Sequence, residues 1–447
     1  MPRAFLVLGV SGSIHLAGDF DLLRLKALTV NAGTSVVRST LRSYLDLPTP
    51  VRLLCLGSFI NRAGSFVIVF LTIYVSEQLG FGIAYAANCF GVFGLGSIIS
   101  SLAGGQLADR FGRKPVMVFA LFGGAAALVL LGVVRDRWGF LGLIFVFSLA
   151  IEMYRPAASA MVGDLVDAAQ RPLAFGLMYI ALNLGFAFAA PVGGFLAQFS
   201  FKLLFWGDAL TTAAYGLIIV FCIRETHPNL SATTRGETQH SDVSLPAAVK
   251  HIQRDSTFLL IALATFLTSL VFMQAFSTLP IHMHQLGFSK RDIGLLLSTN
   301  GVLIVLFQLP VTHVLNRFER VGVILAGELL IGAGFGLTTF AVTGPMFLVT
   351  ISVWTMGEVF QAAFKQSLVA DLAPANMRGR YMGAYSLCHA AGVSIGAPIG
   401  GRILDRWGSQ VLWPSCFAVM IVAAAVYGVV YVKQRSAFVV TTKTGST

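Results

Sequence analysis

The chain has 447 residues, of which 56% are hydrophobic and only 11% are charged, and its mean hydropathy is +0.79. Because soluble globular domains carry about 25% charged residues, this composition excludes an ordinary soluble protein and indicates a helical membrane protein with many spans. The formal charge of +11 does not indicate nucleic-acid binding, because the basic residues lie mainly in one set of loops and no soluble basic domain carries them.

Residues 1–50 are interpreted as an N-terminal tail whose structure the pattern does not define. The apolar run at 4–10 is too short to span a membrane and lacks a convincing cleavage site, which leaves open a surface helix, a disordered tail or a start site assigned too early. Twelve apolar stretches follow, each long enough to cross a hydrocarbon core of about 30 Å. We expect these spans at 53–77, 84–107, 116–134, 139–163, 173–198, 204–223, 257–281, 291–313, 321–341, 346–370, 381–403 and 410–432.

Residues 224–256 separate the sixth and seventh spans and change composition abruptly. They are rich in Thr, Ser, His and charge, which predicts a cytoplasmic linker, with a short helix near 245–254. A second tail is expected at 436–447. All five cysteines fall in predicted spans, so they are interpreted as small buried hydrophobic residues and not as a disulfide or metal set.

The two halves of the chain are weakly similar copies with one constant offset of 207 positions. Gln78-Leu79-Gly80-Phe81 recurs as Gln285-Leu286-Gly287-Phe288, and Asp164-Leu165 recurs as Asp371-Leu372. Residues 51–223 and 257–435 are therefore predicted to be two equivalent six-helix bundles. The expected fold is an all-α membrane protein with twelve transmembrane helices in two pseudo-symmetric bundles, the parallel-repeat architecture of secondary transporters.

Basic residues predict the orientation of the spans. Segments on the side of the termini hold 21 Lys and Arg, the opposite loops hold seven, and three lie inside spans. Under the positive-inside rule, both termini are expected to be cytoplasmic, with the chain in the inner or plasma membrane.

The segment between the second and third spans, 105–114, reads Gly-Gln-Leu-Ala-Asp-Arg-Phe-Gly-Arg-Lys. It resembles the G-x-L-A-D-R-x-G-R-K-[RK] loop signature of the major facilitator superfamily. Together with the spans, the repeat and the linker, the resemblance covers about residues 50–435, and it implies the two-bundle fold above and transport by alternating access.

The resemblance also implies a conformational latch on the cytoplasmic side. An acid at a helix end can accept hydrogen bonds from the N-terminus of another helix, and the family suggests that Asp109 meets the start of span 11 near Arg380 and that Arg113 pairs with Asp164. The expected latch residues are Gly105, Asp109, Arg110, Gly112, Arg113 and Asp164. The alternative is that Arg110, Arg113 and Lys114 only fix the topology. The second copy, 316–320, has lost the carboxylate and the glycine, so any latch there is expected to be weaker.

A small-residue motif in span 5 resembles, imperfectly, the G-P-x-x-G-G signature associated with antiporters in this superfamily. The alternative is a proline kink repacked by small residues. The motif residues, with their copies in span 11, are Gly185, Pro191, Gly193, Gly194, Pro398, Gly400 and Gly401.

Spans 1, 4, 7 and 10 line the central cavity in this superfamily, and polar side chains form stripes at helical spacing on spans 1, 4 and 10. An ionisable side chain at bilayer depth costs roughly 3 kcal/mol or more unless it faces a cavity or a partner, so these residues are candidates for a substrate or proton pathway. The predicted pathway residues are Asn61, Arg62, Glu152, Arg155, Glu358, Gln361 and Lys365.

These charges are not repeated between the two halves, whereas the features that determine the fold are. This difference fits a substrate or ion site better than a structural role. Glu152 and Glu358 are the candidates for proton coupling, because a carboxylate in a cavity responds to a neighbouring cation. The alternative for Glu152 is a permanent pair with Arg155 that stabilises span 4. His389 in span 11 has two interpretations, a proton shuttle or a structural histidine.

The resemblance is closest to the drug/proton antiporter branch, so the primary hypothesis is proton-coupled efflux of small lipophilic molecules or drugs, with the proton gradient as energy source and no cofactor. Five deep charges sum to +1, which suits a lipophilic cation less well than an anion or zwitterion. The alternative is therefore proton-coupled uptake of peptides or other zwitterionic or anionic solutes. Of the E-x-x-E-R motif of peptide transporters, residues 58–62 keep only the arginine.

A non-transporting membrane sensor is a remote alternative. An enzyme is not expected, because the sequence has no metal cluster, nucleophile elbow or Walker loop. The expected partners are a small-molecule substrate, protons and the lipid bilayer, and the chain is expected to be a monomer.

Overall fold

The structure, a computed structural model, describes residues 46–167, 170–226, 245–374 and 377–444. The apolar run at 4–10, nearly all of the predicted N-terminal tail, the middle of the linker and the last three residues lie outside these ranges. Thr49–Thr447 form one unit, distinct from Met1–Pro48.

The first half of this unit contains six crossings. The first is discontinuous and consists of α2 (Thr49–Ala63), α3 (Phe66–Ile73) and a π-helical turn, η1 (Tyr74–Gln78). The remaining five are continuous helices: α4 (Ile83–Phe111), α5 (Arg113–Leu131), α6 (Arg137–Leu165), α7 (Arg171–Phe199) and α8 (Phe201–Cys222). Each contains or closely matches a predicted span.

The second half begins with the short helix expected in the linker, α9 (Leu245–Arg254), and that prediction is confirmed. Its first crossing is again divided, into α10 (Ser256–Phe272), α11 (Gln274–Ser277) and α12 (Leu279–Gln285). The others are α13 (Lys290–Leu315), α14 (Arg320–Leu337) with a 3-10 turn η2 (Thr338–Phe340), α15 (Gly344–Leu372), α16 (Arg378–Trp407) and α17 (Ser409–Thr444). The last helix continues past residue 435, where the sequence analysis ends the bundle.

Eleven helical segments in the described part of the chain are long and apolar enough to cross a membrane. The exception among the twelve expected spans is α16, which is as long as its neighbours but less apolar. It packs against α4 of the other half and against α10, so much of its surface faces protein. Small and polar residues are tolerated in such a position.

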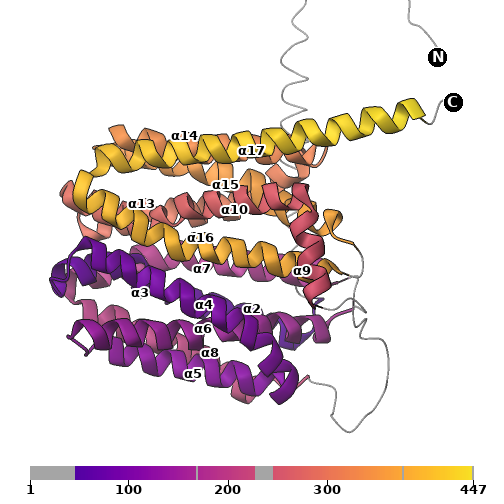
Figure 1. The fold of residues 1–447 in the computed structure, drawn as a ribbon. Coiled ribbons are helices and arrows are strands. Elements are labelled where there is room, and N and C mark those ends of the chain that lie inside the picture. The colour runs from indigo at the N-terminus through magenta and orange to yellow at the C-terminus, as the bar shows by residue number, and fades with distance from the viewer. Residues whose placement is uncertain (1–45, 168–169, 227–244, 375–376, 445–447) are drawn as a thin grey trace, which may run out of the picture. The chain divides into compact units, whose positions relative to one another are not determined.

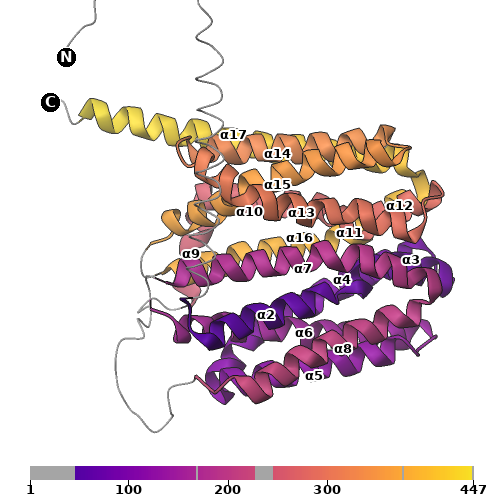
Figure 2. The ribbon, with the colours of Figure 1, turned by 180° about the vertical axis from the view of Figure 1, so that it is seen from behind.

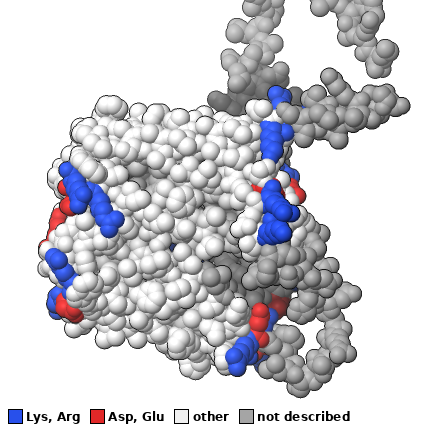
Figure 3. Space-filling view, viewed as in Figure 1, with Lys and Arg blue, Asp and Glu red and all other residues white. Residues whose placement is uncertain are grey.

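The ribbon views show the two halves as neighbouring bundles of roughly parallel helices, α2–α8 and α10–α17 (Figures 1 and 2). We call the helix ends near α9 the linker face, and the ends at loops 79–82 and 286–289 the opposite face. In the space-filling view, Lys, Arg, Asp and Glu gather at the two rims and leave a band of other residues between them (Figure 3). A wide uncharged band is what a lipid-facing surface requires.

The repeated turn at the opposite face has a backbone explanation. Gly80 and Gly287, which are equivalent under the 207-residue offset, have φ angles of +67° and +89°. Such left-handed conformations favour glycine, because a Cβ would clash with the backbone. The recurring Gln-Leu-Gly-Phe sequence therefore encodes the same turn after the first crossing of each half.

Candidate functional site

The first crossing of each half is interrupted at a closely similar position. α2 ends at Ala63 and α3 begins at Phe66. Under the repeat, residues 64–65 correspond to 271–272, directly before Met273, which separates α10 from α11. At the first break, a Cβ on Gly64 would overlap the Thr211 side chain of α8, so glycine allows the helices to approach there. Interrupted helices at matching positions in two repeats mark the binding site in many transporters.

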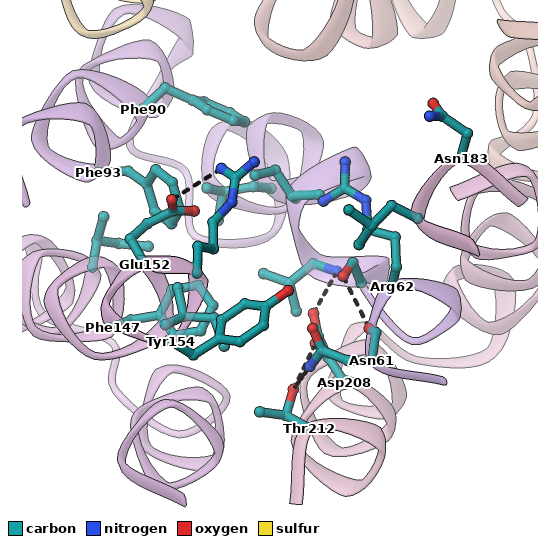
Figure 4. Close-up of a pocket in the computed structure, with 18 of the residues that line it drawn as sticks. Asn61, Arg62, Phe90, Phe93, Phe147, Glu152, Tyr154, Asn183, Asp208 and Thr212 are labelled. Atoms are coloured by element: carbon teal, nitrogen blue, oxygen red, sulfur yellow. Dashed lines mark hydrogen bonds and ion pairs between the residues drawn. The ribbon is translucent and has the colours of Figure 1, made fainter. Parts of the chain in front are cut away.

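A pocket of about 300 Å³ lies beside the break between α2 and α3. Residues of α2, α3, α4, α6, α7 and α8 line it, so it lies within the first half. Aromatic side chains form much of its wall, including Phe90, Phe93, Phe147, Tyr154 and Tyr179 (Figure 4). Four charged side chains also line it: Arg62, Glu152, Arg155 and Asp208.

Two of these charges form an ion pair. Arg155 Nη1 lies 3.1 Å from Glu152 Oε2, one helical turn apart on α6. The side chain of Arg155 is 64% exposed although it lies far from the helix ends, whereas that of Glu152 is 18% exposed. The exposure of Arg155 and its place in the pocket wall indicate an open space inside the molecule at this depth. The predicted Glu152–Arg155 contact is therefore present and faces the pocket.

Asp208 of α8 is the most deeply buried charge of the pocket, at 5% exposure. Its Oδ2 accepts a 3.4 Å hydrogen bond from the N–H of Val67 in the first turn of α3, where the helix dipole favours an anion. Thr212 contacts its Oδ1 at 3.5 Å, and Asn61 donates to Thr212 at 2.9 Å (Figure 4). The predicted pathway residue Asn61 thus lies one hydrogen-bonded residue away from Asp208, a carboxylate that was not among the predicted pathway residues.

Arg62 projects from the end of α2 into the same pocket (Figure 4). Its guanidinium carbon lies 5.3 Å from the centre of the Phe186 ring of α7, a cation–π distance. Among the described residues it makes no ion pair. The pocket therefore combines aromatic walls, a paired acid and base, and two further opposite charges.

A second polar cluster lies in the other half. Lys365 Nζ of α15 is 2.6 Å from Glu328 Oε1 of α14, and the two side chains are only 8% and 0% exposed. The Thr268 hydroxyl of α10 lies 2.9 Å from each oxygen of Glu328. Predicted pathway residue Lys365 is thus buried against a partner that the sequence analysis missed.

The remaining predicted pathway residues of α15 have separate surroundings. Glu358 Oε2 accepts a 2.9 Å hydrogen bond from Asn300 of α13, and Asn300 also donates to Thr355 at 3.2 Å. Gln361 is 5% exposed. His389 of α16 shares a 2.7 Å hydrogen bond with Ser269 of α10. The structure therefore divides the predicted pathway into a pocket in the first half and two buried clusters in the second.

Asp208 and Glu328 correct the charge balance derived from the sequence. With them, three basic and four acidic side chains lie deep in the described helices, so the formal sum is −1 in place of +1. The excess of basic charge expected from the sequence is therefore absent, and the pocket itself holds two basic and two acidic side chains. Asp208 and Glu328 both meet the criterion of an ionisable residue at bilayer depth, but they lie on spans 6 and 9, outside the helices expected to line the cavity.

The motif loop between α4 and α5 is held by residues of its own half. Arg113 Nε lies 3.1 Å from Asp164 Oδ2 at the end of α6, as the family resemblance suggests, and Arg113 Nη2 lies 3.5 Å from Asp109. The expected contact of Asp109 with the start of α16 stays a prediction. Gly112 has φ +101°, which explains the glycine at the corner between the two helices.

A carboxylate from the start of the linker completes this loop. Glu225 accepts hydrogen bonds from the N–H groups of Arg113, at 3.1 Å, and Lys114, at 2.9 Å, and so caps the N-terminus of α5. A Cβ on Gly112 would lie 2.6 Å from Glu225 Oε2. Nothing in the sequence pattern identified Glu225, because its helix partner is 112 positions away.

The second copy of the loop retains one of these contacts. Arg320 pairs with Asp371, and these positions correspond to Arg113 and Asp164 in the repeat. The side chains of Arg320 and Asp371 are 49% and 58% exposed, against 12% and 31% in the first copy. The second pair is therefore more solvated than the first, and such exposed pairs usually contribute little to stability.

Each copy of the small-residue motif contains two consecutive glycines, one of which contacts its own half of the molecule and the other the opposite half. Gly193 of α7 faces Phe66 and Phe70 of α3, and Gly400 of α16 faces Gln274 of α11, each in its own half. The next glycine in each copy, Gly194 or Gly401, faces the other half. A Cβ on Gly194 would meet the backbone of Lys290 of α13, and one on Gly401 would meet Ala87 of α4.

The rest of the motif follows the same division. Gly185 faces Arg62 and Phe59 of α2, in its own half, whereas Pro191 approaches Gly294 of α13 and Pro398 approaches Gly91 of α4. The motif thus packs each broken helix and also joins the halves towards the opposite face. Three glycines nearer the linker face differ, since a Cβ on Gly105, Gly176 or Gly383 would have no neighbour within 4 Å in the described part of the chain.

A polar contact joins equivalent positions of the two halves at the opposite face. Glu77 Oε2 lies 2.7 Å from His284 Nε2, and the two residues are 207 positions apart. Because equivalent positions can meet only on the axis that relates the repeats, this contact marks the pseudo-twofold axis of the molecule.

Comparison with known proteins places these features in a family. The sequence model of the Major Facilitator Superfamily matches residues 54–289 and 261–445. The chain is 30% identical over 370 residues to a Na(+), Li(+), K(+)/H(+) antiporter of Planococcus maritimus, covering 76% of this chain and 86% of the relative. It is 26% identical over 350 residues to the multidrug resistance protein MdtH of Escherichia coli strain SE11, covering 76% and 83%.

Solved structures share the fold at lower identity. A POT family transporter in complex with 5-aminolevulinic acid aligns with a TM-score of 0.72 and 16% identity, covering 87% of this chain and 98% of that one. The human organic anion transporter MFSD10 (TETRAN) aligns with a TM-score of 0.63 and 18% identity, covering 85% and 100%. At such identities the likeness establishes the two-bundle fold alone.

Proposed function

Because the chain belongs to the major facilitator superfamily, and is therefore a multi-pass membrane transporter and not an enzyme, we propose that it is a proton-coupled antiporter that exports small amphipathic organic molecules. The observation that carries this proposal is the pocket beside the first helix break, where aromatic rings surround two carboxylates, Asp208 and Glu152. Aromatic walls suit the apolar body of such a molecule. A carboxylate can hold either a proton or a cationic group of the substrate, so exchange at one site couples the two fluxes.

The names of two relatives support exchange against protons and export. One is called an antiporter for monovalent cations and protons, and another a multidrug resistance protein. The proposed energy source is the proton gradient, and the proposed acting species is a monomer in the inner or plasma membrane. Glu358, hydrogen-bonded to Asn300 in the other half, is proposed as a further proton-binding group.

Contacts between the halves support a rocking motion about the pocket. The tight glycine contacts of α7 with α13 and of α4 with α16 lie towards the opposite face, as does the Glu77–His284 bridge. We assign the linker face to the cytoplasm, since basic residues are concentrated on that side. The pocket then takes its substrate from the cytoplasm in this arrangement, and the halves separate at the opposite face to release it.

The motif loop is proposed to work as a latch at the cytoplasmic side. Arg113, held by Asp164 and by the Glu225-capped helix end, fixes the loop within the first half. Asp109, with a side chain that is 72% exposed, is proposed to bind the N-terminus of α16 in the state that is closed on that side. Arg110 and the glycines Gly105 and Gly112 complete the latch.

A second candidate function is proton-coupled uptake of zwitterionic or anionic solutes. The observation that favours it is Arg62, whose guanidinium faces the pocket and has no ion pair among the described residues. An arginine in this position suits a substrate carboxylate. The two candidates differ in the direction in which protons move relative to the substrate.

Proton flux in proteoliposomes distinguishes these functions. The lumen is loaded at acid pH with a pH-sensitive dye, and either N-methylquinolinium, a permanent aromatic cation, or an aromatic amino acid is added outside. Antiport alkalinises the lumen, symport acidifies it, and no change beyond that of protein-free liposomes contradicts proton coupling. Asp208→Asn is expected to abolish the response, whereas Lys202→Gln, which changes an exposed residue of the opposite face, keeps it.

A further inference from the structure

Two of the four charges in the pocket have no ionic partner within the described part of the chain. Glu152 and Arg155 pair with each other at 3.1 Å, but neither Arg62 nor Asp208 makes an ion pair among the described residues, although both line the same 300 Å³ space. Charges at bilayer depth normally pair or face a functional cavity. Here one positive and one negative group remain available to a ligand.

Packing holds these two groups in place. The backbone of α2 at Arg62 lies against α7, because a Cβ on Gly185 would come within 2.8 Å of Arg62 Cβ. The guanidinium lies 5.3 Å from the Phe186 ring centre. Asp208 is anchored from α8 by the Val67 N–H of the broken crossing, at 3.4 Å. The two charges therefore project from different helices, and their separation depends on the helix break.

We propose that the pocket is a binding site for an aromatic zwitterion, a compact molecule with one carboxylate and one ammonium group. Arg62 binds the carboxylate, since a guanidinium can donate two parallel hydrogen bonds to it. Asp208 accepts hydrogen bonds from the ammonium group. The aromatic body packs against Phe90, Phe93 and Phe147, which line the pocket (Figure 4). This inference rests on the proposed function and narrows its substrate class.

The arrangement also explains why the pocket holds both a paired and an unpaired acid. Glu152 is already neutralised by Arg155 at 3.1 Å, so an ammonium group gains more from Asp208. Asp208 is also the acid that must lose a proton before it can bind the ammonium group as a carboxylate. Substrate and proton therefore compete for Asp208, and Arg62 selects substrates that carry a carboxylate.

Three probes with the same aromatic body test the charge pattern. They are 2-naphthylalanine, a zwitterion; 2-(2-naphthyl)ethylamine, a cation; and N-acetyl-2-naphthylalanine, an anion. Binding to the purified full chain in detergent is measured by titration calorimetry at one pH, without a proton gradient. The zwitterion is expected to bind at least about tenfold more tightly than either of the others, which corresponds to about 1.4 kcal/mol.

Single variants assign each charge of the zwitterion to its partner. Arg62→Gln should remove the advantage of naphthylalanine over the amine, and Asp208→Asn should remove its advantage over the N-acetyl acid. Lys202→Gln and Asp405→Asn remove exposed charges of the same two kinds outside the pocket and should leave the order unchanged. Ligand-free melting temperatures within a few degrees of the parent show that each variant is folded.

Several outcomes would overturn the proposal. If the amine binds most tightly, the pocket is a cation site. If the N-acetyl acid binds most tightly, it is an anion site. If none of the three probes binds, the pocket is not a binding site for aromatic zwitterions. These results concern binding alone. The proteoliposomes could show no proton flux while naphthylalanine still binds most tightly and Arg62→Gln and Asp208→Asn change binding as expected. The proposal of proton coupling would then be wrong, and the proposal of a zwitterion-binding site would be supported.

Discussion

Lys365 Nζ lies 2.6 Å from Glu328 Oε1, and the two side chains are only 8% and 0% exposed. The same ammonium group lies 3.4 Å from the Thr268 hydroxyl and 5.5 Å from the centre of the Tyr427 ring. Neither charge recurs in the first half, where the equivalent positions are Ala158 and Leu121. The pair is therefore specific to the second half, and it ties α15 to α14 and, through Thr268, to α10.

Breaking this pair from one side should destabilise the protein more than removing it entirely. Lys365→Met leaves a buried carboxylate and Glu328→Gln leaves a buried ammonium group, and each is expected to cost about 3–5 kcal/mol. The double variant should cost much less than the sum, because no uncompensated charge remains. The loss of stability is measured by thermal unfolding of the three variants in detergent. If the loss in the double variant equals the sum of the two single losses, the two side chains are not coupled.

The two copies of the loop ion pair should differ in importance. Arg113→Gln removes a contact of a side chain that is 12% exposed, whereas Arg320→Gln removes one of a side chain that is 49% exposed. Exposed pairs contribute about 0–1 kcal/mol, so Arg320→Gln should change the melting temperature little. Arg113→Gln and Glu225→Gln should lower it and slow transport, because both loosen the start of α5. Equal effects of Arg113→Gln and Arg320→Gln would contradict a special role for the first copy.

The sequence was sufficient for the crossings and the linker helix, because long apolar windows and a constant repeat offset are local signals. It was less informative about the site. Asp208 and Glu328 were missed because the pathway was sought on spans 1, 4, 7 and 10, and their partners Val67, Lys365 and Thr268 are far away along the chain. Such pairings depend on helix rotation and on the break at 64–65, which periodicity does not define. The roles of the predicted pathway and latch residues stay predictions.

Glycines between the halves offer a test of the rocking motion. Gly401→Val should disfavour the arrangement seen here, because a side chain at this position would meet Ala87 of α4. A cysteine placed in the pocket of a cysteine-free background should then react faster with a membrane-impermeant maleimide added from the opposite face. Gly383→Val is the matched control on the same helix, since a Cβ there has no neighbour within 4 Å among the described residues. Equal labelling of both variants would show that the Gly401 contact does not set the conformation.

The Glu77–His284 contact should help to keep the opposite face closed. His284 Nε2 faces the Glu77 carboxylate at 2.7 Å and Nδ1 faces the Phe288 carbonyl at 3.3 Å. Glu77 and His284 belong to different halves and lie 207 positions apart. The halves therefore have to break this contact when they separate at the opposite face.

Removal of either partner should therefore speed labelling of the same pocket cysteine from the opposite face. Glu77→Ala and His284→Ala each delete one side of the 2.7 Å contact, so both variants should label faster than the parent. The double variant should label no faster than the single variants, because the same contact is lost in all three. Lys202→Gln changes an exposed residue of the same face and should label like the parent. Labelling at the parent rate in both single variants would show that this contact does not control the opposite face.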